Sequence, residues 1–507
     1  MSSRTNKSMI LFTSEVIFKV LITVLGIVKT RMLIGYLGDS MNGLYQLIIQ
    51  LLAFVTIADL GLDSIYRFAY YKPLAQQDYV KVNEIYNGSK VFFRYSALVM
   101  FVIACFISLL FPFLASQSSF PFWQLFMIMF IFALPSVVEA LFSADISLVS
   151  AQQRNFQVHF INNIKFIVRI LFSFLTIMNR NFIVFILVDS FVAIGFTVLR
   201  YLLLKNYNVA YKKHTKEKDY SPLTLTKYTL FTNINYIVYN NTDNIVISQF
   251  LTLTFVSVYS SFYFVVKALS DIITISIGSI VDIVGNLFAE NKNTYQAFAQ
   301  LEALLFFISM VLAIPLFLGL DHFISLAISN TALYRIDFIS YSLFIILFII
   351  IIISSIWDVI VKANGLYQYY WKISLVESIL NIVISVSLVS VYRFQGVLLG
   401  TILSRMIKYF YCKFIMGEKL QFPMQKQFYT LGLNVAFMVG ILYLVIMIKK
   451  FVIITSLLHW VFIMVASTIG AFVVCFVIYY ALSTDFKVLM HALVQVVKQK
   501  RIKKEIV

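Results

Sequence analysis

The decapeptide VYNNTDNIVI, Val238 to Ile247, places five consecutive polar residues inside an otherwise apolar run from Tyr228 to Leu251. A run of that length can cross the hydrocarbon core of a bilayer, which is about 30 Å thick. One carboxylate and three amides at such a depth are costly unless they face other helices or water. We therefore interpret the stretch as part of a transmembrane helix whose polar face lines the interior of the protein.

The remainder of the 507-residue chain is equally apolar, with 61% hydrophobic and 12% charged residues and a mean hydropathy of +0.89. Soluble domains carry about 25% charged residues. The sequence therefore predicts an all-α polytopic membrane protein of about 14 transmembrane helices. The expected spans are roughly 9–37, 43–70, 89–115, 122–149, 158–178, 182–204, 228–251, 256–285, 297–320, 337–361, 370–391, 395–414, 428–448 and 456–482.

Lysine and arginine are unevenly distributed between the two sets of connections. If the N-terminus is inside, the inner segments hold most of them, including Lys413, whereas the outer connections hold only five. This positive-inside bias predicts that both termini are cytoplasmic. It also accounts for the net charge of +17 without nucleic acid. The basic amphipathic tail, 483–507, is expected to lie on the anionic inner leaflet.

Polar residues recur at two nearly equal offsets, which indicates an internal repeat. A shift of 214 residues places Tyr45 on Tyr259. It also carries one polar stripe onto another, from Glu15, Lys19, Ile22, Gly26 and Lys29 to Thr229, Asn233, Tyr236, Asn240 and Asp243. A shift of 212 carries Asn162, Lys165, Arg169 and Ser173 onto Ser374, Glu377, Asn381 and Ser385. We expect two six-helix bundles, 1–204 and 222–416, a basic cytoplasmic linker, 205–221, and an extra helix pair, 417–482.

Two of the intramembrane cations need an anionic partner. Lys165 and Arg169 are like charges four residues apart on one helix face, so they repel each other. Either a carboxylate of a neighbouring helix or a bound substrate must lie against them, and an ammonium beside a guanidinium suits phosphate. Lys267 and Asp271 have the same spacing but opposite charges, so a plain salt bridge explains them equally well.

Several chemistries lack the residues that they require. The chain has no GxxxxGK[ST], HExxH, CxxC or GxSxG motif, and no long outer connection in which a catalytic site could be assembled. The cysteines and histidines are scattered and predict neither a disulfide framework nor a metal site. We therefore expect the protein not to be an enzyme.

Two stretches resemble a known family. The segment RMLIGYLGDSMNGLYQLIIQLLAFVTIADLGLDSIYRFAYY, from Arg31, is similar to the first two helices of Wzx-type polysaccharide flippases of the multidrug/oligosaccharidyl-lipid/polysaccharide (MOP) superfamily. The matching positions are Gly38, Gly43–Leu44–Tyr45 and Asp59–Leu60–Gly61–Leu62. The segment NTDNIVISQFLTLTFVSVYSSF, from Asn241, resembles the family's seventh and eighth helices.

The resemblance implies a MATE-like fold and a function. Two pseudo-symmetric six-helix bundles with two C-terminal helices would work by alternating access in a bacterial cell membrane. They would move an undecaprenyl-pyrophosphate-linked oligosaccharide from the inner to the outer leaflet for capsular, exo- or O-polysaccharide synthesis. No cofactor is implied beyond a coupling H⁺ or Na⁺. The implied partners are the lipid-linked glycan, membrane lipids, and the polymerase and glycosyltransferases of the same pathway.

The alternatives are a MATE-like small-molecule antiporter, a membrane glycan polymerase or glycosyltransferase, and a lipid II flippase. The candidate substrate-binding residues fall into three groups. The phosphate candidates are Lys19, Lys29, Lys165 and Arg169. The candidates for sugars or for a coupling ion are Asn233, Asn240, Asp243, Asn244, Glu377 and Asn381. Lys267 and Asp271 complete the set.

Overall fold

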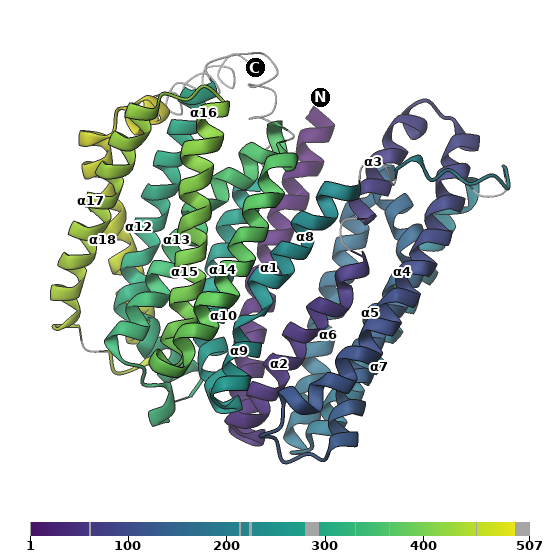
Figure 1. The fold of residues 1–507 in the computed structure, drawn as a ribbon, viewed down its shortest axis with the longest axis horizontal. Coiled ribbons are helices and arrows are strands. Elements are labelled where there is room, and N and C mark those ends of the chain that lie inside the picture. Colours follow the sequence, from purple (N-terminus) through teal and green to yellow (C-terminus); the bar gives the residue numbers. More distant parts are fainter. Residues whose placement is uncertain are drawn as a thin grey trace. The chain divides into compact units, whose positions relative to one another are not determined.

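The computed structural model describes residues 2–59, 62–211, 214–222, 226–278, 294–329, 331–364, 366–452 and 454–491, and these are almost entirely helical (Figure 1). Eleven of the described helices are long and apolar enough to cross a membrane. The chain is therefore an all-helical, multi-pass membrane protein, as predicted. The count of 14 spans stays a prediction, as does the C-terminal tail, most of which lies outside the described residues.

The chain forms two compact units. Unit 1 comprises Met1–Ser261 and Ile382–Val397, and unit 2 comprises Phe262–Asn381 and Leu398–Val507. Helices α10, α14 and α15 contribute to both, and the bundle boundaries predicted from the sequence stay a prediction. The elements up to the linker are α1 (Ser2–Leu37), α2 (Asp39–Val55), η1 (Thr56–Asp59), α3 (Leu62–Ala75), α4 (Tyr79–Leu114), α5 (Phe122–Val149), η2 (Ser150–Arg154), α6 (Asn155–Met178), α7 (Phe182–Leu204) and η3 (Lys205–Tyr211). After it come α8 (Thr226–Asn241), α9 (Asp243–Phe250), α10 (Leu253–Gly278), α12 (Thr294–Ala327), η5 (Ala332–Tyr334), α13 (Phe338–Asn364), α14 (Tyr367–Tyr392), α15 (Phe394–Tyr411), η6 (Cys412–Met416), α16 (Gly417–Lys419), α17 (Met424–Lys449) and α18 (Leu457–Leu482).

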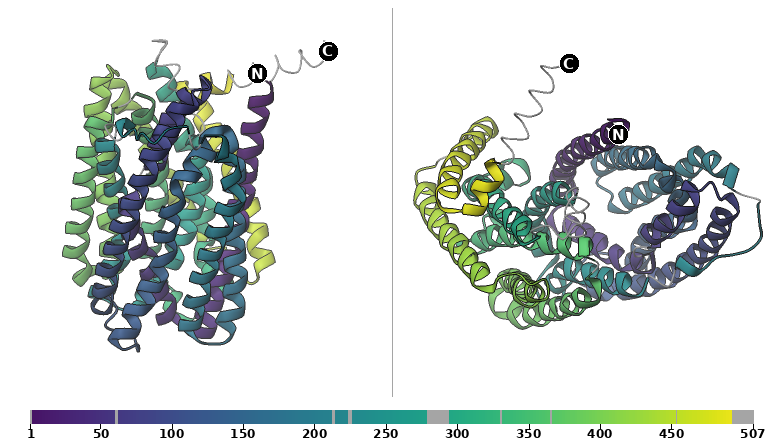
Figure 2. Two further views of the ribbon diagram at one scale, coloured as in Figure 1. Left: turned by 90° about the vertical axis from the view of Figure 1, so that its right-hand side faces the viewer. Right: turned by 90° about the horizontal axis from the view of Figure 1, so that it is seen from above.

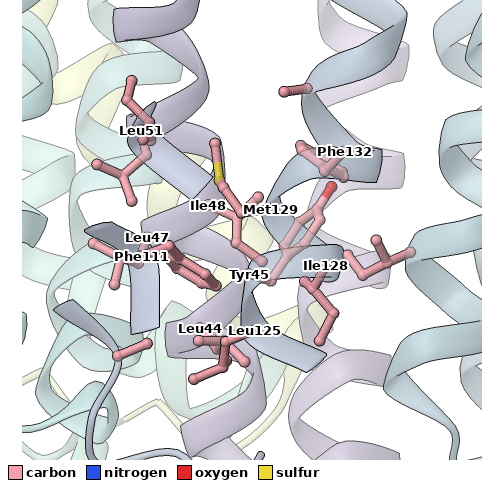
Figure 3. Packing of buried hydrophobic residues seen from close by; sticks show 14 of the residues in the cluster. Leu44, Tyr45, Leu47, Ile48, Leu51, Phe111, Leu125, Ile128, Met129 and Phe132 are labelled. Atoms are coloured by element: carbon pink, nitrogen blue, oxygen red, sulfur yellow. The ribbon is translucent and has the colours of Figure 1, made fainter. Parts of the chain in front are cut away.

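The core of unit 1 forms where α2, α4, α5 and α7 pack together (Figure 3). Tyr45 of α2 contacts the rings of Phe132 and Phe185, with centroid separations of 6.0 and 5.2 Å. Gly43, one turn from the centre of this cluster, lies against the start of α10. A Cβ added at Gly43 would lie 1.8 Å from the carbonyl oxygen of Leu253, so only glycine permits this approach.

Two predicted spans are broken in the structure, and the prediction of continuous helices there is wrong. The span 228–251 divides at Thr242 into α8 and α9, and the span 43–70 divides into α2, η1 and α3. At the first break, the side chains of Asn240 and Asn241 donate to the carbonyl oxygens of Tyr236 and Ile237, four residues earlier. Asparagine side chains that bond to the backbone in this way compete with the helical hydrogen bonds. The polar decapeptide is therefore a helix break as well as a polar face.

A segment of the basic linker is held against α4. We call residues 214–221 the strap. Asn83 Oδ1 accepts two backbone N–H groups of the strap, at 3.0 and 2.8 Å, and Asn87 Nδ2 donates to two of its carbonyl oxygens, at 3.0 and 3.1 Å. Lys81 Nζ lies 3.0 Å from Asp219. Burial raises the pKa of Asp219, but hydrogen bonds from the following turn and from Lys81 outweigh it and hold this pKa below its ordinary value. The strap is therefore an ordered part of unit 1.

Unit 2 is centred on two well-buried helices. In both α12 and α13, 78% of the residues in the most apolar 18-residue stretch are buried, against 17% in α17 and 11% in α18. Both C-terminal helices pack on α12, and the long helices of the unit run along a common direction (Figure 2). The apolar side chains that α17 and α18 leave exposed suit contact with lipid.

Candidate functional site

Glu139 of α5 lies between two cations of unit 1. Its carboxylate accepts a hydrogen bond from Lys165 Nζ of α6 at 3.1 Å and one from Arg200 of α7 at 2.8 Å. Arg200 also donates to the side chain of Asn162 on α6. Glu139 and Lys165 lie near the middle of their helices, where charged side chains are usually excluded.

Asp189 of α7 is shared in the same way. Arg169 of α6 donates to both of its carboxylate oxygens, and Lys29 Nζ of α1 lies 4.0 Å from Oδ1. Lys29 also donates to the Tyr45 hydroxyl at 2.7 Å and lies over the rings of Tyr45 and Phe185. The aromatic core of unit 1 therefore fixes the position of the Lys29 ammonium.

We call six charged residues of these two groups the charged network of unit 1: Lys29, Glu139, Lys165, Arg169, Asp189 and Arg200. The sequence left open whether carboxylates or a substrate lie against Lys165 and Arg169, and the structure places carboxylates there. The pairing is nonetheless unequal, because each carboxylate serves two cations. Within these six residues two carboxylates face four cations, and Asp59 of η1 is a third carboxylate close enough to interact electrostatically with Glu139. The network therefore keeps an excess of positive charge that suits an anionic ligand.

The offsets found in the sequence also relate hydrogen-bonded pairs in the structure. Lys29 pairs with Tyr45, and 214 residues later Asp243 accepts a hydrogen bond from Tyr259. Arg169 pairs with Asp189, and 212 residues later Asn381 donates to Thr401 at 2.9 Å. Equivalent positions of the repeat thus make equivalent contacts. The first copy uses charges where the second uses an acid or neutral groups.

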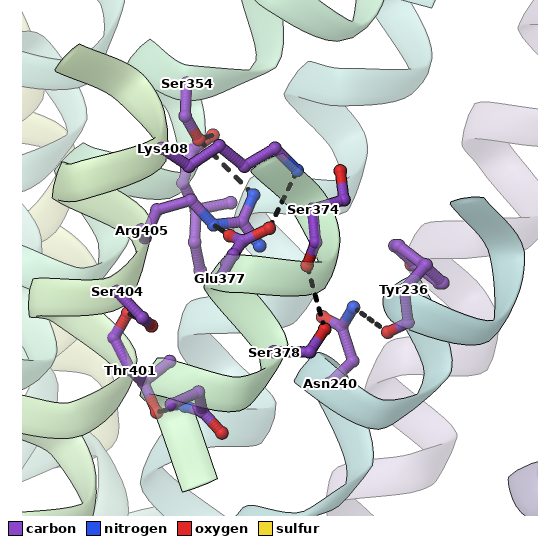
Figure 4. A network of polar contacts seen from close by, with 12 residues as sticks. Tyr236, Asn240, Ser354, Ser374, Glu377, Ser378, Thr401, Ser404, Arg405 and Lys408 are labelled. Carbon is purple, nitrogen blue, oxygen red and sulfur yellow. Dashed lines mark hydrogen bonds and ion pairs between the residues drawn. The ribbon is translucent and has the colours of Figure 1, made fainter. Parts of the chain in front are cut away.

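Unit 2 contains a further carboxylate shared by two cations (Figure 4). Glu377 of α14 lies 2.7 Å from Lys408 Nζ and 2.7 Å from Arg405 Nε, both of α15. The contact with Arg405 is an ion pair whose angle falls outside hydrogen-bond geometry. Lys408 lies over the ring of Tyr370, whose hydroxyl donates to Asp358. Because Asp358 adds a second carboxylate, this cluster is closer to neutral than the network of unit 1.

The break between α8 and α9 holds three of the predicted polar residues. Asp243 and Asn244 are buried in the first turn of α9, and Asn244 Nδ2 donates to Ser260 at 2.8 Å. Asn240 lies in the last turn of α8 and donates to its own helix (Figure 4). Asn233 is half-buried two turns earlier. Discontinuous helices of this kind carry binding sites in many transporters.

The remaining predicted residues lie apart from these clusters. Lys267 and Asp271 form the salt bridge that their spacing suggested. Lys19 is half-buried on α1, about 10 residues before Lys29. The structure thus brings Lys29, Lys165 and Arg169 into the network of unit 1 and Glu377 into the cluster of unit 2. Their roles in binding stay predictions.

Sequence reasoning missed several charged residues of these clusters. Arg200 lies close to the end of its predicted span, where a basic residue normally marks the membrane boundary, but Arg405 and Lys408 lie well inside theirs. Lys413, assigned to an inner connection, is fully buried and lies 2.6 Å from Glu302. An intramembrane carboxylate on a neighbouring span could have indicated these basic residues, because a buried acid requires a partner. Among the described residues, no group of three or more histidine, cysteine or acidic side chains could hold a metal ion.

Solved structures with the same arrangement of helices exist at low sequence identity. The lipid II flippase MurJ, in an inward closed conformation, superposes with a TM-score of 0.66 over 93% of this chain and 99% of MurJ, at 16% identity. The chain has the fold of the MOP-superfamily transporters. An inward-facing multidrug-resistance MATE transporter of that superfamily gives a TM-score of 0.56 at 9% identity, over 78% of this chain and 97% of its own. A eukaryotic MATE transporter gives 0.55 at 11% identity, over 83% of this chain and 97% of its own. No family model and no characterised relative matches the sequence itself.

Proposed function

We propose that this protein is a flippase for a polyprenyl-pyrophosphate-linked oligosaccharide. It would carry the repeat unit from the inner to the outer leaflet of a bacterial cell membrane, by alternating access and with both termini cytoplasmic. A headgroup of sugars and phosphates cannot cross hydrocarbon unaided, so a polar path that stays open to lipid lowers the barrier while the polyprenyl tail remains in the membrane. No covalent chemistry is needed.

The observation that carries the proposal is the excess positive charge in the network of unit 1. Among the described residues, Lys29, Lys165, Arg169 and Arg200 form ion pairs with two carboxylates, Glu139 and Asp189. Maintaining buried cations in excess of their counter-ions costs stability. Such a cost is retained where the charges serve a ligand, and a pyrophosphate is the part of the proposed substrate that matches them. Asn233, Asn240, Asp243, Asn244, Glu377 and Asn381 remain the candidates for sugars or for a coupling H⁺ or Na⁺.

The fold supports a transporter, and the argument for a substrate class rests on the residues of the site. Multidrug MATE transporters share the fold, as does MurJ, which is a lipid II flippase. Lipid II also carries a polyprenyl pyrophosphate, so a lipid II flippase is the second candidate. A small-molecule antiporter for cations is disfavoured by the same positive charge. A polymerase or glycosyltransferase would lengthen a glycan when given donor and acceptor, which a flippase does not.

Deletion of the gene followed by lipid analysis tests the proposal. We expect a finished lipid-linked repeat unit to accumulate on the inner leaflet, and the double variant Lys165→Ala/Arg169→Ala to reproduce this phenotype. The variant Lys426→Ala, which breaks an exposed ion pair with Asp485 in unit 2, serves as the control for general damage. Accumulation of lipid II instead would favour the second candidate, and no accumulation of any lipid-linked glycan would refute the proposal.

A further inference from the structure

Glu139 differs from the other shared carboxylates in its exposure. Its side chain is 37% exposed, whereas those of Asp189 and Glu377 are 1% and 3% exposed. A carboxylate near the middle of a membrane-spanning helix cannot face hydrocarbon cheaply, which favours a water-filled space beside it. Its partners Lys165 and Arg200 are less exposed, at 10% and 3%. An anion entering from the wet side therefore meets Glu139 before it reaches either cation.

Arg200 keeps an unused donor in this arrangement. Its two terminal nitrogens bond to Asn162 and Glu139, but its buried Nε has no hydrogen-bond partner among the described residues. A buried donor without a partner costs about 1–3 kcal/mol. The pyrophosphate of the proposed substrate has two non-bridging oxygens and one negative charge on each phosphorus, so it can serve more of these donors than a carboxylate can.

We propose that Glu139 is an exchangeable counter-ion that sets the release of the headgroup. It occupies Lys165 and Arg200 while the site is empty and gives way when phosphate binds. Its return then competes with the phosphate and frees it. A transport site has to bind strongly enough to load and weakly enough to unload. The inference rests on the proposed function and adds to it the positioning residue that limits affinity.

The substitution Glu139→Gln tests this idea, because it keeps the shape of the side chain and removes its charge. Binding of inorganic pyrophosphate to the purified full-length protein is measured by calorimetry, and lipid flipping is measured in proteoliposomes. We expect pyrophosphate to bind about tenfold more tightly, since a nearby like charge is removed, and flipping to slow several-fold. A purely structural role would weaken binding or leave it unchanged. Tighter pyrophosphate binding together with slower flipping therefore identifies the counter-ion role.

Asp321→Asn in unit 2 is the matched control. The Asp321 side chain is also 37% exposed and has a lysine partner, Lys449, at 3.0 Å, but it lies outside the charged network. Neither binding nor flipping should change in this variant. If Glu139→Gln does not yield folded protein, Glu139→Asp decides the matter, because the shorter arm weakens the contact with Lys165. Tighter pyrophosphate binding than in the wild type then supports the inference.

The possible failures are distinguishable. If the wild-type protein binds no pyrophosphate and moves no lipid-linked glycan, the proposed function falls and this inference falls with it. If the wild type binds pyrophosphate and the Glu139 variant binds it no more tightly, only the counter-ion role is overturned.

Discussion

Replacing Lys413 by methionine is expected to destabilise the protein by about 3–5 kcal/mol. Lys413 Nζ lies 2.6 and 2.8 Å from the two carboxylate oxygens of Glu302. The side chains are 0% and 4% exposed, and the Tyr409 hydroxyl donates to the same carboxylate at 2.8 Å. Methionine preserves most of the packing but leaves a carboxylate in a dry interior with one neutral donor. The loss of stability therefore measures the cost of leaving the Glu302 carboxylate without a counter-ion.

The assay is thermal unfolding of the purified protein in detergent, followed by loss of the monodisperse species. Adding Glu302→Gln to Lys413→Met should restore most of the stability, because no buried charge is then left unpaired. Lys426→Met is the control within the same unit. Its lysine is 47% exposed and lies 3.6 Å from Asp485, so the expected loss is below about 1 kcal/mol. Equal stability of the two single lysine variants would refute the reasoning.

Three further predictions concern unit 1. Gly43→Ala inserts a Cβ 1.8 Å from a carbonyl oxygen and should cost about 1–3 kcal/mol in thermal unfolding, whereas Gly35→Ala, with nothing within 4 Å, should cost nothing; equal melting temperatures would contradict this. Asn87→Ala removes two hydrogen bonds to the strap and should speed tryptic cleavage there, so an unchanged cleavage rate would count against the docking described. Tyr45→Phe and Tyr259→Phe each remove a hydrogen bond to a charged side chain, worth about 1.5–3 kcal/mol, and a loss in only one would argue against equivalent roles in the repeat.

The class of fold and the repeat could be predicted because they depend on periodic patterns. Apolar runs report a helical membrane protein whatever their packing. The repeat was detectable because an offset carries polar residues onto polar residues, as from Lys29 to Asp243. The structure adds that both positions bond to an equivalent tyrosine, which supports the alignment.

What could not be predicted depends on contacts between helices. The like charges of Lys165 and Arg169 required a partner, but nothing in their own segment identifies Glu139 and Asp189. Arg200 was not among the predicted site residues because its position along the helix, rather than its partner, was the available signal. The break at Thr242 was missed for a similar reason. A polar run is compatible with a continuous helix face until the side chains are seen to compete with the backbone.

Transport of a lipid-linked oligosaccharide in proteoliposomes tests the central claim most directly. A labelled polyprenyl-pyrophosphate oligosaccharide is reconstituted with the purified protein, and a glycosidase added outside reads the fraction of glycan in the outer leaflet. We expect this fraction to rise with time in the wild type and to stay at the protein-free level in Lys165→Ala/Arg169→Ala. A wild-type trace that matches protein-free liposomes would contradict the flippase function. A double variant that transports as fast as the wild type would contradict the role of the charged network in binding phosphate.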